Sequence, residues 1–147
     1  MQNHFSSRAV AWASSHRDVA LDVMRIYLGT ALFVRGVLII DNPQLVGNYV
    51  THVDWFWPYL VAHYVAMAHF GGGALLALGL VTRLAAAIQV PALVGAVFFV
   101  HIHDGLMSQS QSLELAVLVL FMLLVFMVFG AGRLSLDRYL FGVDVPD

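Results

Sequence analysis

The stretch LGTALFVRGVLII, residues 28–40, decides the class of this protein. Apart from Thr30 and Arg35, every residue in it is apolar or glycine, and the apolar run extends over about residues 19–41. About 20 such residues are enough for a helix to cross the hydrocarbon layer of a membrane. A charged side chain at that depth costs roughly 2.5–3.5 kcal/mol on insertion scales. We therefore hypothesise that Arg35 belongs to a functional site.

The composition of the whole chain indicates an integral membrane protein. Of the 147 residues, 61% are hydrophobic and only 11% are charged, whereas a soluble domain carries about 25% charged residues. The chain has no lysine and a net charge of −2, so it has no basic patch for nucleic acid. It also has no cysteine, which excludes disulfides, thiolate metal sites and iron–sulfur clusters.

Hydropathy predicts one all-α membrane domain over residues 1–147, an integral membrane four-helix bundle. The four predicted spans are about 19–41, 59–81, 84–103 and 113–130. The sequence DNP at residues 41–43 ends the first span. The connection between the second and third spans is so short that these two helices must be antiparallel neighbours. Residues 1–18 form an N-terminal segment, and residues 131–147 are expected to lie along the interface.

The arginines predict the orientation of the four spans. The first and third connections contain no basic residue, whereas both ends of the chain and the second connection contain several. These basic residues are Arg8, Arg17, Arg25, Arg83, Arg133 and Arg138. Under the positive-inside rule both termini are cytoplasmic. The aromatic run WFWPY, residues 55–59, then falls at the outer interface.

Polar residues gather in the predicted outer half of the membrane. By helix rise, Arg35 lies about 9 Å below Asp41, and His69 lies about 15 Å inside the second span. His103 ends the third span and Glu114 begins the fourth, both at the outer side. We therefore predict a polar chamber formed by Arg35, His69, His103 and Glu114.

Stripes of small residues predict which helix faces pack together, because small side chains let membrane helices approach closely. Three stripes are expected: Arg25, Gly29, Leu32 and Gly36 in the first span, Ala62, Ala66, His69, Gly73 and Ala77 in the second, and Gln89, Ala92, Ala96 and His103 in the third. His63 points about 120° away from His69. Pro91 should bend the third helix.

The chamber has two interpretations. In the functional one, Arg35 and a histidine donate to a quinone carbonyl, and a histidine or Glu114 takes protons from a quinol. In the structural one, Arg35 pairs with Glu114 or Asp41 and the histidines bind backbone across helices. Haem b is disfavoured, because His69 lies about 10 Å deeper than His101 or His103. No metal site is expected, since the acidic and histidine residues lack a ligand spacing.

Several segments resemble the DoxX family: MRIYLGTALFVRG at residues 24–36, HFGGGALLALGLVTRLAA at 69–86, LELAVLVL at 113–120 and GAGRLSLDRYL at 130–140. The resemblance covers about residues 24–141. It implies a four-helix protein of a bacterial or archaeal cytoplasmic (inner) membrane, associated with quinone-linked respiratory or sulfur-oxidising redox systems. His69 stands where family members commonly have a glutamate, and Arg35 replaces a lysine that often follows the first-helix glycine.

Two functions follow as expectations. The first is a redox-linked membrane subunit that binds a quinone or similar apolar ligand in the outer-half chamber. The second is a non-catalytic structural or assembly subunit of a larger membrane complex. In both, the expected partners are membrane lipid and other membrane subunits, in a hetero-complex or a homo-oligomer. With so little chain outside the membrane, electrons would have to come from a partner or a bound cofactor.

Overall fold

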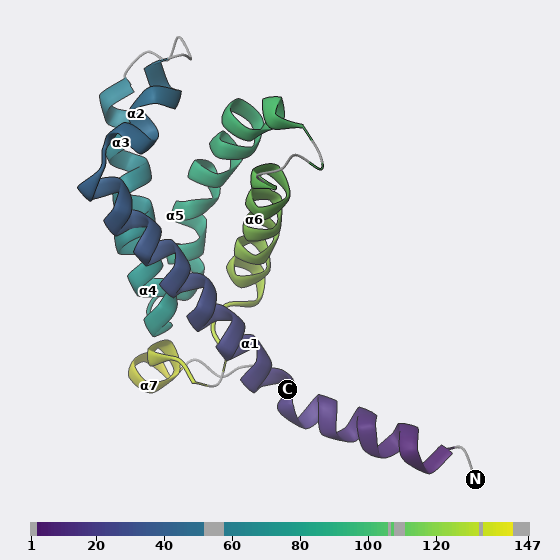
Figure 1. Ribbon diagram of the computed structural model, residues 1–147. Coiled ribbons are helices and arrows are strands. Elements are labelled where there is room, and N and C mark those ends of the chain that lie inside the picture. The colour runs from purple at the N-terminus through teal and green to yellow at the C-terminus, as the bar shows by residue number, and fades with distance from the viewer. Residues whose placement is uncertain (1–2, 52–57, 106, 108–110, 133, 143–147) are drawn as a thin grey trace.

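The fold is a bundle of four long helices, with a short helix at each end of the bundle (Figure 1). The computed structural model describes residues 3–51, 58–105, 107, 111–132 and 134–142, and it gives no side-chain detail for 3–17, 48–51, 58, 103, 104 and 141. All regular elements in these ranges are helical: α1 (Asn3–Asp41), α2 (Gln44–Thr51), α3 (Pro58–Met67), the π-helix η1 (Ala68–Gly72), α4 (Gly73–Leu78), α5 (Thr82–Gly95), the π-helix η2 (Ala96–Val100), the 3₁₀-helix η3 (His101–Asp104), α6 (Ser112–Phe129) and α7 (Leu136–Phe141).

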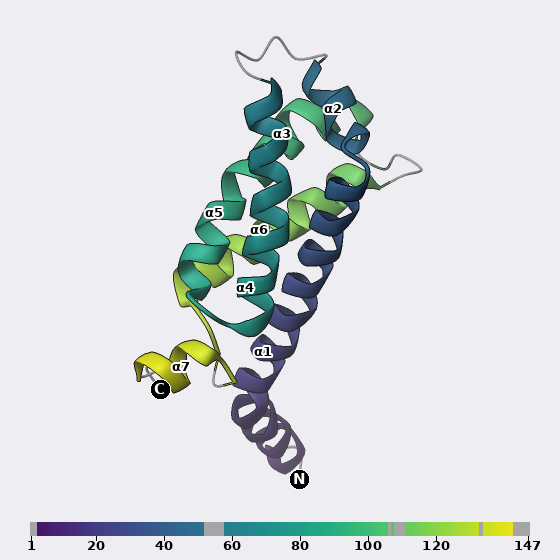
Figure 2. The same ribbon diagram turned by 90° about the vertical axis from the view of Figure 1, so that its left-hand side faces the viewer.

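The four predicted spans are confirmed as helices long and apolar enough to cross a membrane. They cover Asp18–Asp41, Tyr59–Leu78, Thr82–Val100 and Ser112–Phe129. The second helix is shorter than predicted, because Gly79 adopts a left-handed conformation (φ +68°) and the chain turns before α5. The backbone of the N-terminal segment continues α1 as one helix, which projects beyond the bundle in both ribbon views (Figure 2).

The first connection differs from the predicted loop, because it contains α2. α1 ends at Asp41, as the DNP sequence predicted. The aromatic run WFWP falls on residues 55–58, which lie outside the residues whose side chains the structure describes. Below, the end of the bundle that carries α2 is called the α2 end, and the opposite end is called the α7 end.

α1 packs closely against the second helix along the predicted glycine stripe. A methyl group on Gly36 would overlap the backbone nitrogen of Phe70, and one on Gly29 would overlap the backbone of Ala77. Gly73 meets the backbone of Phe33 in the same way. Without a hydrophobic driving force between helices in lipid, such close backbone contact is a main source of helix association.

An ion pair between Arg25 and Asp22 stabilises the α7 end of the bundle. Arg25 and Asp22 are both fully buried, and Nη2 of Arg25 lies 3.3 Å from Oδ1 of Asp22. Arg25 also donates to the carbonyl oxygens of Leu76 (2.7 Å), Ala77 (3.0 Å) and Leu134 (2.8 Å). The other carboxylate oxygen of Asp22 accepts from the Leu134 N–H at 2.8 Å. Arg25 thus joins three segments of the chain, whereas the sequence predicted only a role in orientation and a place on the packing face of the first span.

The C-terminal segment is held under the turn between α4 and α5. Asp137 accepts hydrogen bonds from the backbone N–H groups of Val81 and Thr82 (2.9 Å for Thr82), and its own N–H donates to the carbonyl of Gly79 at 2.9 Å. The side chain thereby satisfies free donors at the start of α5. The glycine-rich sequence before α7 follows the end of α6, which lies at Phe129, and Gly130 has φ +79°.

At the α2 end, the bundle separates into two helix pairs. The main buried cluster, which includes Leu28, Leu76 and Leu123, joins all four long helices. Nearer the α2 end, Val97, Leu113 and Ala116 form a second buried cluster from η2 and α6 alone. Pro91 removes one backbone donor inside α5, and the wide turns of η2 follow it. Figure 1 shows α5 and α6 leaning away from α1 and α3 beyond this point.

Candidate functional site

The separation of the two helix pairs encloses a cavity of about 720 Å³. Its walls come from α1, α2, α3, η1, α5, η2, η3 and α6, and most of the lining side chains are aliphatic or aromatic. The lining also includes five polar residues: Arg35, Tyr64, His69, His101 and Ser112. Ligand sites in proteins typically have about 300–1,000 Å³ and combine apolar walls with a few polar groups. The cavity has the size and composition of such a site.

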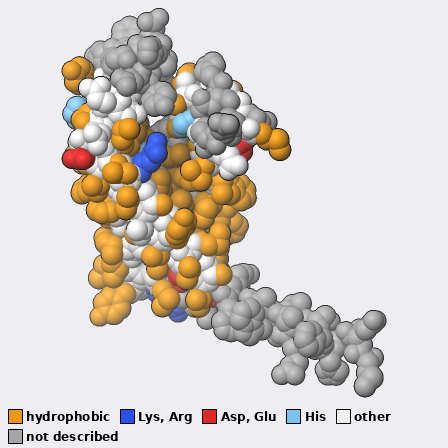
Figure 3. Space-filling model, viewed as in Figure 1, with side chains coloured by type: hydrophobic (Ala, Val, Ile, Leu, Met, Phe, Trp, Pro, Cys, Tyr) orange, Lys and Arg blue, Asp and Glu red, His pale blue; other side chains and the backbone are white. Residues whose placement is uncertain are grey.

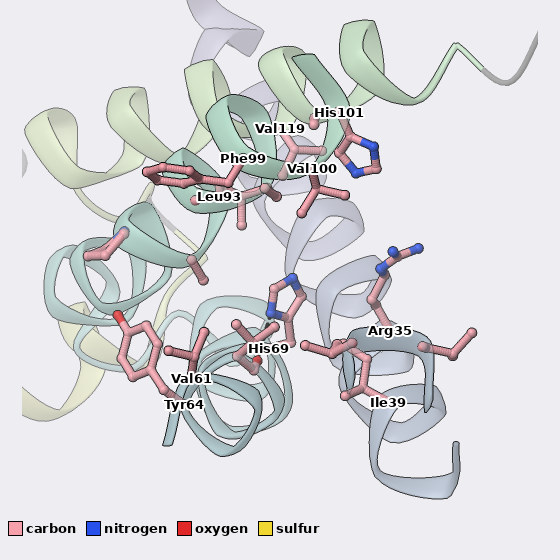
Figure 4. A pocket seen from close by; sticks show the side chains of 18 of the residues that line it. Arg35, Ile39, Val61, Tyr64, His69, Leu93, Phe99, Val100, His101 and Val119 are labelled. Carbon is pink, nitrogen blue, oxygen red and sulfur yellow. Dashed lines mark hydrogen bonds between the residues drawn. The ribbon is translucent and has the colours of Figure 1, made fainter. Parts of the chain in front are cut away.

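Arg35 lies on the cavity wall formed by α1, and its side chain is exposed. Within the described residues, no carboxylate forms an ion pair with it. The pairs that the structural interpretation required, with Glu114 or with Asp41, are therefore not formed. Figure 4 shows the guanidinium extending away from the α1 backbone toward one end of the cavity.

His69 lies at the centre of the cavity in Figure 4, and its side chain is only 7% exposed. Nδ1 lies 2.8 Å from the carbonyl oxygen of Val65, one turn earlier on the same helix. Since a carbonyl oxygen can only accept, Nδ1 must carry a hydrogen and donate it. In the neutral ring, Nε2 is then an acceptor that is left for another partner. The predicted hydrogen bond of His69 across helices is replaced by this bond within its own helix.

The close crossing of α1 and the second helix brings Arg35 and His69 into one cavity. Gly36, directly after Arg35, abuts the backbone of Phe70 and the carbonyl carbon of His69. The rings of Phe33 and Phe70 pack beside this contact with centroids 5.0 Å apart. Because only glycine permits this approach, the Arg35–Gly36 and His69–Phe70 sequences meet directly.

Both π-helices of the chain's described part contribute to the cavity. His69 belongs to η1, whereas Ala96, Phe99 and Val100 belong to η2. A π-turn inserts one residue into the helical repeat and re-aims the side chains around it, and such turns occur frequently at functional sites. The spacing rules of a regular α-helix therefore miss the directions of these side chains.

The other two residues of the predicted chamber are Glu114 and His103. Glu114 does not belong to the cavity lining; its Oε1 accepts from the backbone N–H of Met107, and no described group binds its buried Oε2. Its role is to hold the connection before α6. The side chain of His103 lies outside the described residues. The structure thus brings together two of the four predicted residues.

Three further polar residues of the cavity were not among the predicted four: Tyr64, His101 and Ser112. His101 lines the cavity wall opposite Arg35. It is the first residue of the 3₁₀-helix η3. Tyr64 spans from α3 to α5, where its hydroxyl donates to the carbonyl of Ile88. The sequence signal for His101 was its position at the predicted outer end of the third span. His103 shares that position, so the sequence did not select His101.

The predicted stripe of α1 is confirmed, because its four residues are buried and its two glycines abut the second helix. In the other two stripes His69, Gly73, Gln89 and Ala92 are buried, whereas Ala62, Ala66, Ala77 and Ala96 are partly buried. His63 lies apart from the cavity, as predicted. His63 is exposed and binds the carbonyl of Tyr59 at 2.7 Å. Gln89 is fully buried against Gly72, and its Oε1 has no described partner.

Residues 20–102 match the family model of DoxX. The chain belongs to the DoxX family. The match covers more than half of the chain, from α1 into η3, and includes both Arg35 and His69. No curated protein and no solved structure matches the chain. The protein is therefore a DoxX family membrane protein with four candidate transmembrane helices.

Proposed function

We propose that the cavity is a binding site for a quinone or a similar apolar ligand that is dissolved in the membrane. The observation that supports this most directly is the presence of both Arg35 and His69 in a largely apolar cavity of about 720 Å³. The first residue offers hydrogen-bond donors, and the second offers Nε2 as an acceptor. A quinone carbonyl requires a donor, and a quinol hydroxyl requires an acceptor.

The residues fit the chemistry of this ligand class. When bound, a quinone would supply two-electron, two-proton redox chemistry that the side chains of this chain do not provide. The Arg35 guanidinium would orient a carbonyl oxygen through charge-assisted hydrogen bonds. His69 would accept a proton at Nε2 while Val65 holds Nδ1. The apolar walls would exclude water from the reacting end.

In this proposal the protein is a subunit of a quinone-linked redox complex in the cytoplasmic membrane of a bacterium or archaeon, with both termini cytoplasmic. The chain contains no cysteine, so a partner subunit or its cofactor would pass the electrons. The alternative is an accessory subunit whose cavity holds no redox ligand and which stabilises a larger complex.

A titration with a short-chain quinone tests the proposal. We expect native mass spectrometry of the detergent-solubilised protein to show one bound quinone. Loss of a hydrogen bond to a charged or buried partner is worth about 1.5–3 kcal/mol, so His69→Leu and Arg35→Leu should each weaken binding by roughly tenfold or more.

His63→Leu is the matched control, because His63 lies on the same helix but outside the cavity. Equal weakening in His63→Leu would show that the cavity is not the site. Release of the protein with large redox subunits and without a bound quinone would favour the accessory role.

A further inference from the structure

The cavity lies in a gap between α1 and α6. α1 packs mainly on α3, η1 and α4, and α6 packs mainly on α5, with no extensive contact between α1 and α6. In the space-filling view, the surface is hollowed between the two helix pairs near the α2 end (Figure 3). In a chain whose four long helices cross a membrane, such a gap between neighbouring helices opens sideways into the lipid.

Among the described residues, no carboxylate forms an ion pair with Arg35 at this hollow. Figure 3 shows a basic side chain and a histidine on opposite sides of the hollow. Figure 4 shows Arg35 and His101 near the same end of the cavity. Glu114, which the sequence predicted near Arg35, accepts a hydrogen bond from the backbone N–H of Met107 instead.

An unpaired guanidinium within a membrane helix is costly, and the cost is reduced when the side chain reaches the interface or meets an anion. Arg35 lies about 9 Å from the end of α1 by helix rise, so its long side chain can extend toward the headgroup level. An arginine binds phosphate oxygens through two parallel hydrogen bonds.

We propose that this hollow binds one anionic phospholipid from the leaflet at the α2 end, with its phosphate on Arg35 and one acyl chain inside the cavity. The acyl chain would lie against apolar residues of α1, η2 and α6, such as Ile39, Val100, Ala116 and Val119. The net negative charge of the lipid supplies a counter-charge for Arg35, which forms no ion pair with a carboxylate among the described residues. A zwitterionic lipid carries its own cation beside the phosphate and supplies less.

The inference rests on the proposed function in one respect: both treat the cavity as a ligand site. Lipid and quinone binding are therefore measured separately on the full chain in mild detergent, by native mass spectrometry after removal of co-purified lipid. Phosphatidylglycerol and phosphatidylcholine with identical acyl chains are the lipid probes. A short-chain quinone is the third probe.

We expect one phosphatidylglycerol to bind the wild-type chain more tightly than phosphatidylcholine does. Arg35→Gln should weaken phosphatidylglycerol binding by roughly tenfold to a hundredfold and remove the preference between the two lipids. Arg35→Lys keeps the positive charge but cannot form the bidentate hydrogen bonds, so it should retain part of the preference for phosphatidylglycerol. Arg83→Gln, which removes an exposed arginine at the α7 end, should leave it unchanged.

Equal binding of both lipids, or equal losses in Arg35→Gln and Arg83→Gln, would overturn the lipid site. If quinone nevertheless binds, the proposed function survives that failure. Preferential phosphatidylglycerol binding without any quinone binding would support the lipid site and contradict the proposed function. A mass of two chains without lipid would assign the hollow to a second copy and overturn the inference.

Discussion

Arg25 and Arg35 both belong to α1, but their surroundings are opposite. Arg25 is fully buried and is bound by Asp22 and by carbonyl oxygens from two other segments. Arg35 is exposed, lines an apolar cavity and has no described carboxylate partner. A buried charge whose donors are largely satisfied within the chain has a structural role, whereas an unpaired charge at a cavity is available for a ligand.

The largest expected effect is on Arg25. Removing one partner of a buried ion pair leaves the other charge uncompensated, which costs about 3–5 kcal/mol. Arg25→Leu should lower the free energy of unfolding in detergent by that amount, because Asp22 then stays buried without its cationic partner. Thermal or chemical unfolding of the purified variant measures the loss.

Arg35→Leu is the matched control for that measurement. Substitutions at exposed positions usually change stability by about 0.5 kcal/mol or less, so this variant should unfold like the wild type while it loses ligand binding. If the two variants are equally destabilised, the distinction between the two arginines fails.

An intermediate effect is expected at the helix crossing beside Arg35. A methyl group on Gly36 would overlap the backbone of Phe70, so Gly36→Ala must push α1 away from η1. Overpacking of this kind costs about 1–3 kcal/mol. Because the crossing also sets the Arg35–His69 arrangement, quinone affinity should fall together with stability.

Gly71→Ala controls for the loss of a glycine in the same region, because a Cβ there would meet nothing within 4 Å. Its stability and quinone affinity should match those of the wild type. Full quinone affinity in Gly36→Ala would show that the crossing does not position the site.

The smallest effect is expected at Asp137, which binds the first N–H groups of α5. Asp137→Asn replaces one of the two accepting oxygens with an NH₂ group, so one of the two hydrogen bonds is lost, which costs about 0.5–1.5 kcal/mol. Hydrogen exchange should accelerate at the Val81 and Thr82 amides. Asp41→Asn, at an exposed position, should leave those amides unchanged, and faster exchange there in both variants would contradict the assigned role.

Local sequence patterns determined the four spans, because about 20 apolar residues in succession have no stable alternative to a helix in lipid. They also determined the glycine stripe of α1 and its packing face, since small residues at helical spacing mark close approach. The depth of Arg35 and His69 followed from helix rise alone. These properties depend on residues that are near one another in the chain.

Only the tertiary structure decided the partners of the charged residues and the existence of the cavity. Arg25 meets Leu134 across a sequence separation of 109 residues, and no periodicity indicates such a contact. Glu114 faces the Met107 backbone rather than Arg35. On the side of α5 the cavity is lined by Pro91 and by residues of the π-helix η2. Hydropathy specifies which segments enter the membrane, but the packing of distant backbones determines where the polar side chains of those segments meet.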